Sequence, residues 1–283
     1  MQELTTPDGR TLAYEVRGSG EPLVCHPGGP GFSGGYMHDL GGLAGSHSLV
    51  VLDPRGTGGS DPGPRPEAYA LADYAADLEA LHDHLGLEQI DLLGHSHGSL
   101  VAIRYAADHP ERVRRLVLAT TCARFQEEQL KAMEAAMQER AGEPWFADAS
   151  AALQAEEAGE FENDAELAQL VARELPFYFA DYGDAEKAFV EEVMTDPVHA
   201  AALGYFNEHE FMAFDLRPLL PAVTASTLVV AGERDFILGP AACAEVADGI
   251  AGARLELLDG VGHMLWVEAP DRFAALVGDF LAS

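Results

Sequence analysis

Positive charge is scarce in this chain. Lys and Arg together number 17 against 47 Asp and Glu, so the formal net charge is −30. Lysine contributes only two of those cations, Lys131 and Lys187. A field of that sign repels nucleic acid and anionic membrane surfaces. We therefore expect no nucleic-acid partner and no binding to a membrane.

Cysteine is equally sparse, and long hydrophobic runs are missing. The three cysteines, Cys25, Cys122 and Cys243, lie far apart, and an odd number leaves one unpaired in any disulfide scheme. Buried reduced thiols in a cytoplasmic protein suit that pattern better. No stretch approaches ~18 uninterrupted apolar residues, and the start of the chain lacks the basic and apolar segments of a signal peptide. The sequence thus predicts a cytoplasmic protein without a transmembrane helix.

What the chain does have is a regular alternation of short apolar runs and longer helical patterns. With 283 residues it is long enough to bury a substantial core. The runs predict strands at 11–18, 22–27, 47–54, 89–94, 114–122, 226–232 and 253–260, and the longer patterns predict helices at 71–86, 98–110, 241–252 and 269–283. Strand and helix in alternation indicate an α/β fold with a mostly parallel central sheet flanked by helices.

One region breaks this alternation. From 124 to 217 the chain is helical in pattern and rich in Glu and Ala, and its apolar residues give it surface to bury, which argues against disorder. We interpret it as a helical cap inserted between two strands of the sheet. The expected organisation is a first part of the core at 1–123, the cap at 124–217, and a second part of the core at 218–283.

A short motif between a predicted strand and a predicted helix points to chemistry. Gly94-His95-Ser96-His97-Gly98 matches G-x-S-x-G in the strand–turn–helix context that the motif requires. Such a turn needs small flanking residues and lifts the serine hydroxyl to a helix N-terminus, which stabilises developing negative charge. Ser96 is therefore the candidate nucleophile. A metal site at His95 and His97 is not expected, because no further ligands accompany them at suitable spacing.

A serine nucleophile needs a base and an orienting acid. His263 lies in a loop after the last predicted strand, and Asp235 follows the strand at 226–232. The order Ser96, Asp235, His263 is that of the α/β-hydrolase fold. Taken singly, Asp235 could cap a helix and His263 could be a turn residue. Glu233 is the neighbour that could be mistaken for the acid, but it lies closer to the strand end.

The same chemistry needs an oxyanion hole. One donor is expected from the backbone N–H of His97, the residue after the nucleophile. The other is expected from Gly29, in a glycine-rich loop at 25–36 that follows an early strand and is stiffened by Pro27 and Pro30. A flexible loop without a role is the alternative.

These motifs resemble those of the α/β-hydrolase superfamily, and within it those of the proline iminopeptidase (prolyl aminopeptidase) family. Gly28-Gly29-Pro30-Gly31 keeps the G-G-P-G part of the family's H-G-G-P-G loop, with His26 displaced by the inserted Pro27. The family's second motif, D-x-R-G-x-G-x-S, is kept by Asp53, Arg55, Gly56, Gly58 and Ser60. We expect this second motif to shape the loop beside the site and not to carry chemistry.

The resemblance implies release of an N-terminal residue, typically proline, from a peptide. It also implies carboxylates that hold the substrate's free amine, and near the cap's end Glu210 is the first candidate and Glu208 the second. Either could instead be a solvated glutamate. This chain departs from the family at His97, where an aromatic residue is common, and at Phe236, where an acidic residue often follows the catalytic Asp.

The leading hypothesis is a cofactor-free serine hydrolase that acts on a small molecule or short peptide through an acyl-enzyme. Its specific form is a proline iminopeptidase-like aminopeptidase, and a carboxylesterase, lactonase or thioesterase is the alternative. A non-catalytic binding protein of the same fold is the hypothesis from another class. No cofactor is expected, because "RGTGGS" lacks the G-x-G-x-x-G spacing and no P-loop is present.

Overall fold

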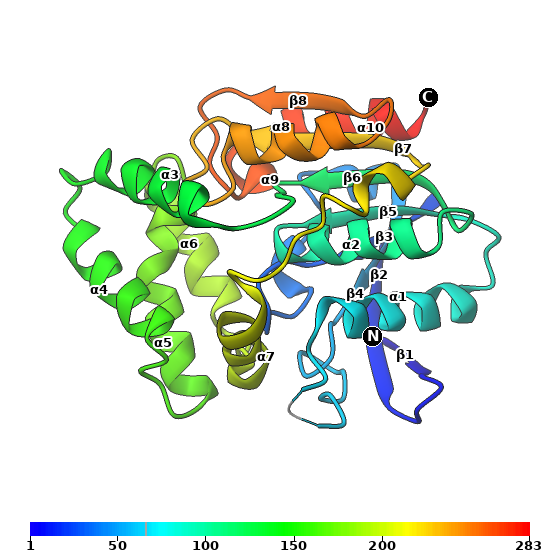
Figure 1. The fold of residues 1–283 in the computed structure, drawn as a ribbon, viewed down its shortest axis with the longest axis horizontal. Helices are drawn as coiled ribbons and strands as arrows, with labels where there is room; N and C mark the ends of the chain where they lie inside the picture. The colour runs from blue at the N-terminus through cyan, green and yellow to red at the C-terminus, as the bar shows by residue number, and fades with distance from the viewer. Residues whose placement is uncertain (66) are drawn as a thin grey trace.

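In the computed structural model, which describes residues 1–65 and 67–283, eight strands form one sheet (Figure 1). The strands are β1 (Gln2–Thr5), β2 (Thr11–Gly18), β3 (Glu21–His26), β4 (His47–Leu52), β5 (Ile90–His95), β6 (Val113–Ala119), β7 (Ser226–Gly232) and β8 (Arg254–Leu258). Their order is β1-β2-β4-β3-β5-β6-β7-β8, and only the two pairings that involve β2 are antiparallel. The prediction of a mostly parallel sheet is confirmed. Strand β1 was not predicted, because four residues are too short to display an alternating pattern.

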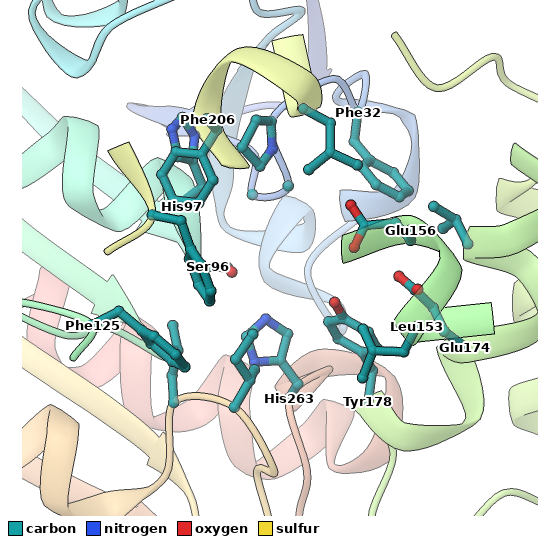
Figure 2. Close-up of a pocket in the computed structure, with 18 of the residues that line it drawn as sticks. Phe32, Ser96, His97, Phe125, Leu153, Glu156, Glu174, Tyr178, Phe206 and His263 are labelled. Carbon is teal, nitrogen blue, oxygen red and sulfur yellow. The ribbon is translucent and has the colours of Figure 1, made fainter. Parts of the chain in front are cut away.

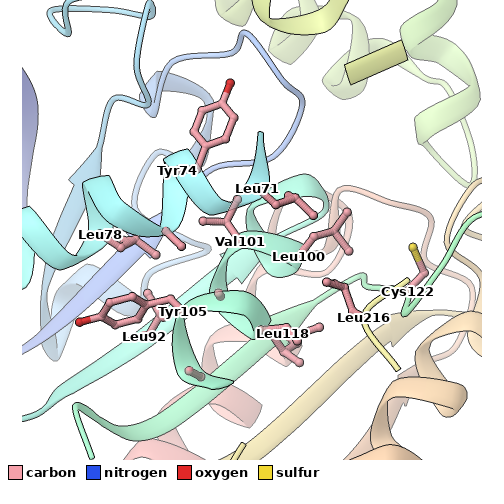
Figure 3. Packing of buried hydrophobic residues seen from close by; sticks show 14 of the residues in the cluster. Leu71, Tyr74, Leu78, Leu92, Leu100, Val101, Tyr105, Leu118, Cys122 and Leu216 are labelled. Atoms are coloured by element: carbon pink, nitrogen blue, oxygen red, sulfur yellow. The ribbon is translucent and has the colours of Figure 1, made fainter. Parts of the chain in front are cut away.

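Helices cover both faces of the sheet, and the central strands send alternate side chains into two cores. In β5, Leu92 packs with the first core and Leu93 with the second. The first core lies beneath α1 (Leu71–Leu85), α2 (His97–Asp108) and α8 (Pro240–Gly249), and Figure 3 shows Leu78 of α1 and Val101 of α2 meeting Leu92 there. The second core lies beneath α9 (Leu265–Glu268) and α10 (Pro270–Leu281). Burial on both faces explains why these strands are continuous apolar runs.

Between β6 and β7 the chain forms a separate group of helices at the left of Figure 1. They are α3 (Glu127–Gln138), α4 (Phe146–Glu157), α5 (Asp164–Glu174), α6 (Asp184–Val193) and α7 (Ala200–Tyr205), and a π-helical turn at Phe206–Glu210 follows α7. The segment leaves and rejoins the core at one point, where Arg124 and Asp215 form an isolated antiparallel bridge. This neck supports the division at 124–217, which remains a proposal.

The carboxyl ends of β3, β5, β7 and β8 open toward these cap helices. In open α/β sheets, ligands bind at that edge of the sheet, beside the loops that follow the strands. The loops after these four strands carry the predicted triad residues Ser96, Asp235 and His263 and the two predicted oxyanion donors, Gly29 and His97. Over residues 1–65 and 67–283, no helix combines the length and the apolar character needed to cross a bilayer.

Candidate active site

Ser96 occupies a strained turn between β5 and α2. Its φ of 52° and ψ of −122° put a non-glycine residue at positive φ, which is costly and is typical of functional turns. Only glycine fits at the two flanking positions, 94 and 98, because any side chain there would overlap neighbouring backbone atoms. A Cβ on Gly98 would overlap the carbonyl oxygens of Pro27 and His26, and one on Gly94 would overlap the carbonyl of Gly98. The turn predicted from the sequence is therefore present, with Ser96 at the N-terminus of α2.

His263 and Asp235 meet in the loops that follow β8 and β7. The Nδ1 atom of His263 lies 2.8 Å from Oδ2 of Asp235, and both side chains are buried. Oδ1 of Asp235 accepts hydrogen bonds from the backbone N–H groups of Ile237 (3.0 Å) and Leu238 (3.1 Å). The carboxylate is thus fixed on both oxygens, and its bond to Nδ1 leaves Nε2 of His263 without a part in this contact.

Ser96 and His263 face the same cavity in Figure 2. Within the described part of the chain, no hydrogen bond joins the Ser96 hydroxyl to His263. Contacts of this kind often tighten only when substrate binds. The structure thus places Ser96 at the same cavity as the hydrogen-bonded pair of His263 and Asp235.

The glycine-rich loop after β3 lies directly against Ser96. A Cβ placed on Gly28 would be 2.6 Å from the Cβ of Ser96. Gly29 has a φ of +62°, which favours glycine. His97 is the first residue of α2, so its N–H has no partner within the helix. The two predicted oxyanion donors, Gly29 and His97, therefore both border the cavity beside Ser96.

The His263 loop is held by the cap through contacts that the sequence does not indicate. The His263 N–H donates to the carbonyl of Tyr178 at 2.8 Å. Glu268 accepts hydrogen bonds from the backbone N–H groups of Gly262 (3.0 Å) and Ala180 (2.7 Å), and burial raises the pKa of its carboxyl to about 7. The cap and the His263 loop are therefore held together.

The cavity has a volume of about 410 Å³ and mostly apolar walls. Its lining residues come from the core and from most of the cap helices, and the apolar ones include Phe32, Leu100, Phe125, Met133, Leu153 and Phe206. A space of this size and character suits a small organic molecule or a short peptide.

Three glutamates interrupt the apolar wall on the cap side, Glu156, Glu157 and Glu174, and of these Glu156 and Glu174 are buried. Glu156 of α4 and Glu174 of α5 are 6% and 4% exposed, and Figure 2 shows both carboxyl groups turned toward the cavity. Glu156 accepts a hydrogen bond from the Asn207 amide at 2.8 Å, whereas Oε2 of Glu174 has no partner among the described residues. Burial raises the pKa of Glu156 to about 7. Burial, followed by the charges of Glu156 and Glu157, raises that of Glu174 well above its usual range.

The sequence carries a signal for each of these two acids, in the spacing of apolar residues along its helix. Leu167, Val171 and Glu174 recur at helical spacing on the buried face of α5. On α4, Leu153 and Glu156 share a buried face in the same way. A glutamate on the apolar face of a predicted helix is an exception that merits a functional explanation.

Glu210 and Glu208, the acids that the resemblance implies as amine anchors, lie elsewhere. The Glu210 carboxylate accepts hydrogen bonds from the Leu71 N–H at 3.3 and 3.4 Å, at the start of α1. Glu208 is exposed, 3.8 Å from His209. Neither is among the described residues that line the cavity. The alternative acid Glu233 is also exposed, and it accepts a hydrogen bond from the Gly260 N–H.

The second glycine motif has structural contacts. Asp53 accepts hydrogen bonds from the N–H groups of Gly34 and Gly59, each at 3.0 Å. Nε of Arg55 lies 2.7 Å from Oδ2 of Asp77, and both side chains are buried. These bonds brace the loops behind the site, in agreement with the shaping role expected from the sequence.

Both departures from the family's motifs fall on the cavity wall. The His97 ring packs edge-on against Tyr74 and Phe206, with centroids 5.2 and 5.1 Å apart, and burial lowers its pKa to about 3. Phe236 packs edge-on against Tyr178, with centroids 4.9 Å apart. Both rings therefore act as neutral packing surface.

Comparison with known proteins supports the same family. The sequence matches the model of the alpha/beta hydrolase fold over residues 21–270. It is 31% identical to the proline iminopeptidase of Lactobacillus helveticus over 274 residues, which span 92% of this chain and 89% of that protein. It is also 31% identical to a putative carbamate hydrolase of Variovorax paradoxus over 278 residues, 96% of each chain.

Among solved structures, the enol-lactonase of Burkholderia xenovorans LB400 matches with a TM-score of 0.76 and 27% identity, over 100% of both chains. The matches confirm the resemblance and the fold that the sequence predicts. The chain belongs to the alpha/beta-hydrolase fold family.

Proposed function

We propose that the chain is a serine hydrolase with Ser96 as nucleophile. His263 Nε2 removes the proton from the Ser96 hydroxyl as Oγ attacks the acyl carbon, and Asp235 stabilises the imidazolium that forms. The backbone N–H groups of Gly29 and His97 bind the oxyanion. His263 then protonates the leaving group, and water releases the acyl group from the enzyme by the reverse sequence. The supporting geometry is the hydrogen-bonded pair of His263 and Asp235 beside the Ser96 turn.

Within this class, the proposed substrate is a short peptide or amide with a free N-terminal amine, as for the proline iminopeptidase of Lactobacillus helveticus. The observation that carries this choice is the pair of buried carboxyls, Glu156 and Glu174, in the wall of an apolar cavity. Within the described chain, neither is paired with Lys, Arg or His.

A buried carboxylate without a cation is costly, and a bound ammonium removes that cost. The substrate amine would supply one positive charge and would favour ionisation of the acid that it contacts, while the other acid can stay protonated. The unpartnered Oε2 of Glu174 is the first acceptor we assign to it, with Glu156 as the second. In this proposal Glu174 and Glu156 take the role that the family resemblance gives to Glu210 and Glu208.

A small neutral ester or lactone is the second candidate substrate. Most of the other lining side chains are aliphatic or aromatic, and the raised pKa values leave both acids able to stay neutral. The enol-lactonase with 27% identity is consistent with this candidate. The same nucleophile and base cleave esters and amides, so substrate recognition decides between the two.

The test compares hydrolysis of a proline arylamide with that of an aryl ester of the same size without an amine. We expect Glu174→Gln to lower kcat/KM for the arylamide by about tenfold or more, as for a lost charge-assisted hydrogen bond, and to leave ester hydrolysis unchanged. Glu191→Gln, which removes an exposed carboxylate from α6, is the matched control.

Two outcomes contradict the amine assignment. One is an arylamide that wild-type protein does not cleave although it cleaves the ester. The other is an arylamide activity that is lost in Glu210→Gln and kept in Glu174→Gln, which would return the amine to the acid implied by the family resemblance.

A further inference from the structure

A continuous chain of hydrogen bonds runs behind Ser96 and joins two loops of the site. The backbone N–H of Gly28 donates to the Tyr36 hydroxyl at 2.5 Å. The same hydroxyl lies 2.7 Å from Nδ1 of His95. Nε2 of His95 lies 3.2 Å from the backbone carbonyl of His263. This series of hydrogen bonds therefore begins in the glycine-rich loop of the proposed oxyanion donor and ends on the backbone of His263, the proposed base.

The direction of each bond follows from donor chemistry. The His263 carbonyl can only accept, so the His95 proton is on Nε2. Nδ1 of a neutral imidazole then accepts, and the Tyr36 hydroxyl donates to it while its oxygen accepts from Gly28. Burial lowers the pKa of His95 and raises that of Tyr36, so both stay in the neutral forms that this order requires.

The two side chains are also fixed by packing. The His95 ring lies edge-on to Trp266, with centroids 4.7 Å apart, and 4.8 Å from the ring of His263. Tyr36 lies against Trp266 at 5.9 Å. Apolar residues in place of His95 and Tyr36 could fill the same space, but they would form none of the three hydrogen bonds. Packing alone therefore does not account for bonds that connect the Gly28 loop to the His263 loop.

The bond to Tyr36 also determines which glycine can serve the oxyanion. Because the Gly28 N–H is directed at the phenol, it is not available to a bound substrate. The next residue, Gly29, has the positive φ that turns the chain at this point. Tyr36 therefore fixes the orientation of the peptide that precedes the proposed donor.

We propose that His95 and Tyr36 are positioning residues that hold the oxyanion loop and the His263 loop in register around Ser96. This inference rests on the proposed serine-hydrolase function. It assigns a role to the histidine before the nucleophile, which the triad itself does not use. Neither residue touches the reacting atoms, so both act through the loops that they hold.

Three variants separate the bond between His95 and Tyr36 from the bond between His95 and the His263 carbonyl. In His95→Asn the amide oxygen can replace Nδ1 as the partner of Tyr36, but the bond to His263 is lost. In His95→Gln the amide nitrogen can replace Nε2 as the donor to His263, but the bond to Tyr36 is lost. Tyr36→Phe removes the hydroxyl and both of its bonds. Tyr14→Phe is the matched control, since its hydroxyl bonds Gln2 and His84 away from the site.

We expect each His95 variant to lower kcat for an aryl ester by about tenfold, the effect of one lost hydrogen bond, and Tyr36→Phe, which loses two, to lower it at least as much, with KM unchanged in all three. His95→Gln and Tyr36→Phe should weaken binding of a boronic acid, which mimics the oxyanion intermediate, by a similar factor. His95→Asn should instead shift the pH profile of kcat/KM, because the His263 carbonyl loses its hydrogen bond and the loop that carries the proposed base is less well held. A role in packing alone would lower the melting temperature without these separate kinetic changes.

The inference is overturned if the variants keep a native melting temperature and also have the kcat, the boronate affinity and the pH profile of the wild-type protein. If Tyr36→Phe does not fold, the two His95 variants still decide it. Failure of the proposed function is distinguishable. A wild-type protein that neither cleaves the ester nor reacts with a fluorophosphonate refutes both proposals, whereas an active wild type with unaffected variants refutes only this one.

Discussion

Replacing Gly28 by alanine tests the oxyanion loop at the point where it touches the nucleophile. The added Cβ would lie 2.6 Å from the Cβ of Ser96, 2.7 Å from the His95 carbonyl oxygen and 3.0 Å from its Nδ1. Since carbon atoms pack at about 3.5–4 Å, the loop must withdraw by about 1 Å. The adjacent Gly29 N–H would move with it, out of the narrow range in which an oxyanion donor works.

Loss of one oxyanion donor costs about 3 kcal/mol in the barrier, so kcat should fall by about 10²- to 10³-fold while KM changes little. The assay is steady-state hydrolysis of an aryl ester, with the melting temperature measured on the same samples. Gly142→Ala is the control, because a Cβ there meets no atom within 4 Å. A folded Gly28→Ala protein whose kcat stays within about threefold of wild type would refute this account of the loop.

Three other predictions concern the acid of the triad, the cavity glutamates and the second motif. Asp235→Asn should lower kcat by about 10⁴-fold with KM nearly unchanged, because an amide favours the wrong tautomer of the base; steady-state kinetics check this, and a loss below about tenfold would contradict it. The folded pKa of Glu156, about 7, lies above its ordinary value of 4.5, so stability falls as pH rises between those values. Glu156→Gln should remove that fall and stabilise the protein at pH 8 by at most about 3 kcal/mol, with no gain at pH 4, as measured by urea unfolding; equal unfolding free energies at pH 8 would speak against it. Asp77→Asn removes the buried carboxylate that pairs with both Arg55 and Arg10 and should cost about 3–5 kcal/mol in urea unfolding, whereas a change under about 1 kcal/mol would mean that these pairs do not brace the loops.

Features set by local chemistry were predictable from the sequence. The strand at 226–232 has the predicted bounds, because a buried parallel strand is a continuous apolar run with a clear end. The turn around Ser96 followed from Gly94 and Gly98, whose missing side chains the tight backbone demands. The approach of Asp235 to His263 followed from topology, since loops after parallel strands emerge at one edge.

Features set by distant contacts were not predictable in this way. Glu156 and Glu174 lie on different helices and reach one cavity only after the cap folds over the core. The Tyr36 contact with His95 joins residues 59 positions apart, and nothing local marks it. The family resemblance implies Glu210 as an amine anchor, yet its carboxylate accepts from the Leu71 N–H, 139 positions away. Short-range patterns carry no information about such pairs.

The central claim is that Ser96 is an activated nucleophile. The most direct measurement is reaction of the folded protein with a fluorophosphonate, followed by intact-mass analysis and peptide mapping. The account predicts one adduct per chain, located on Ser96, absent in Ser96→Ala and strongly slowed in His263→Ala. An unlabelled wild-type protein, or an adduct on a residue other than Ser96, would contradict it.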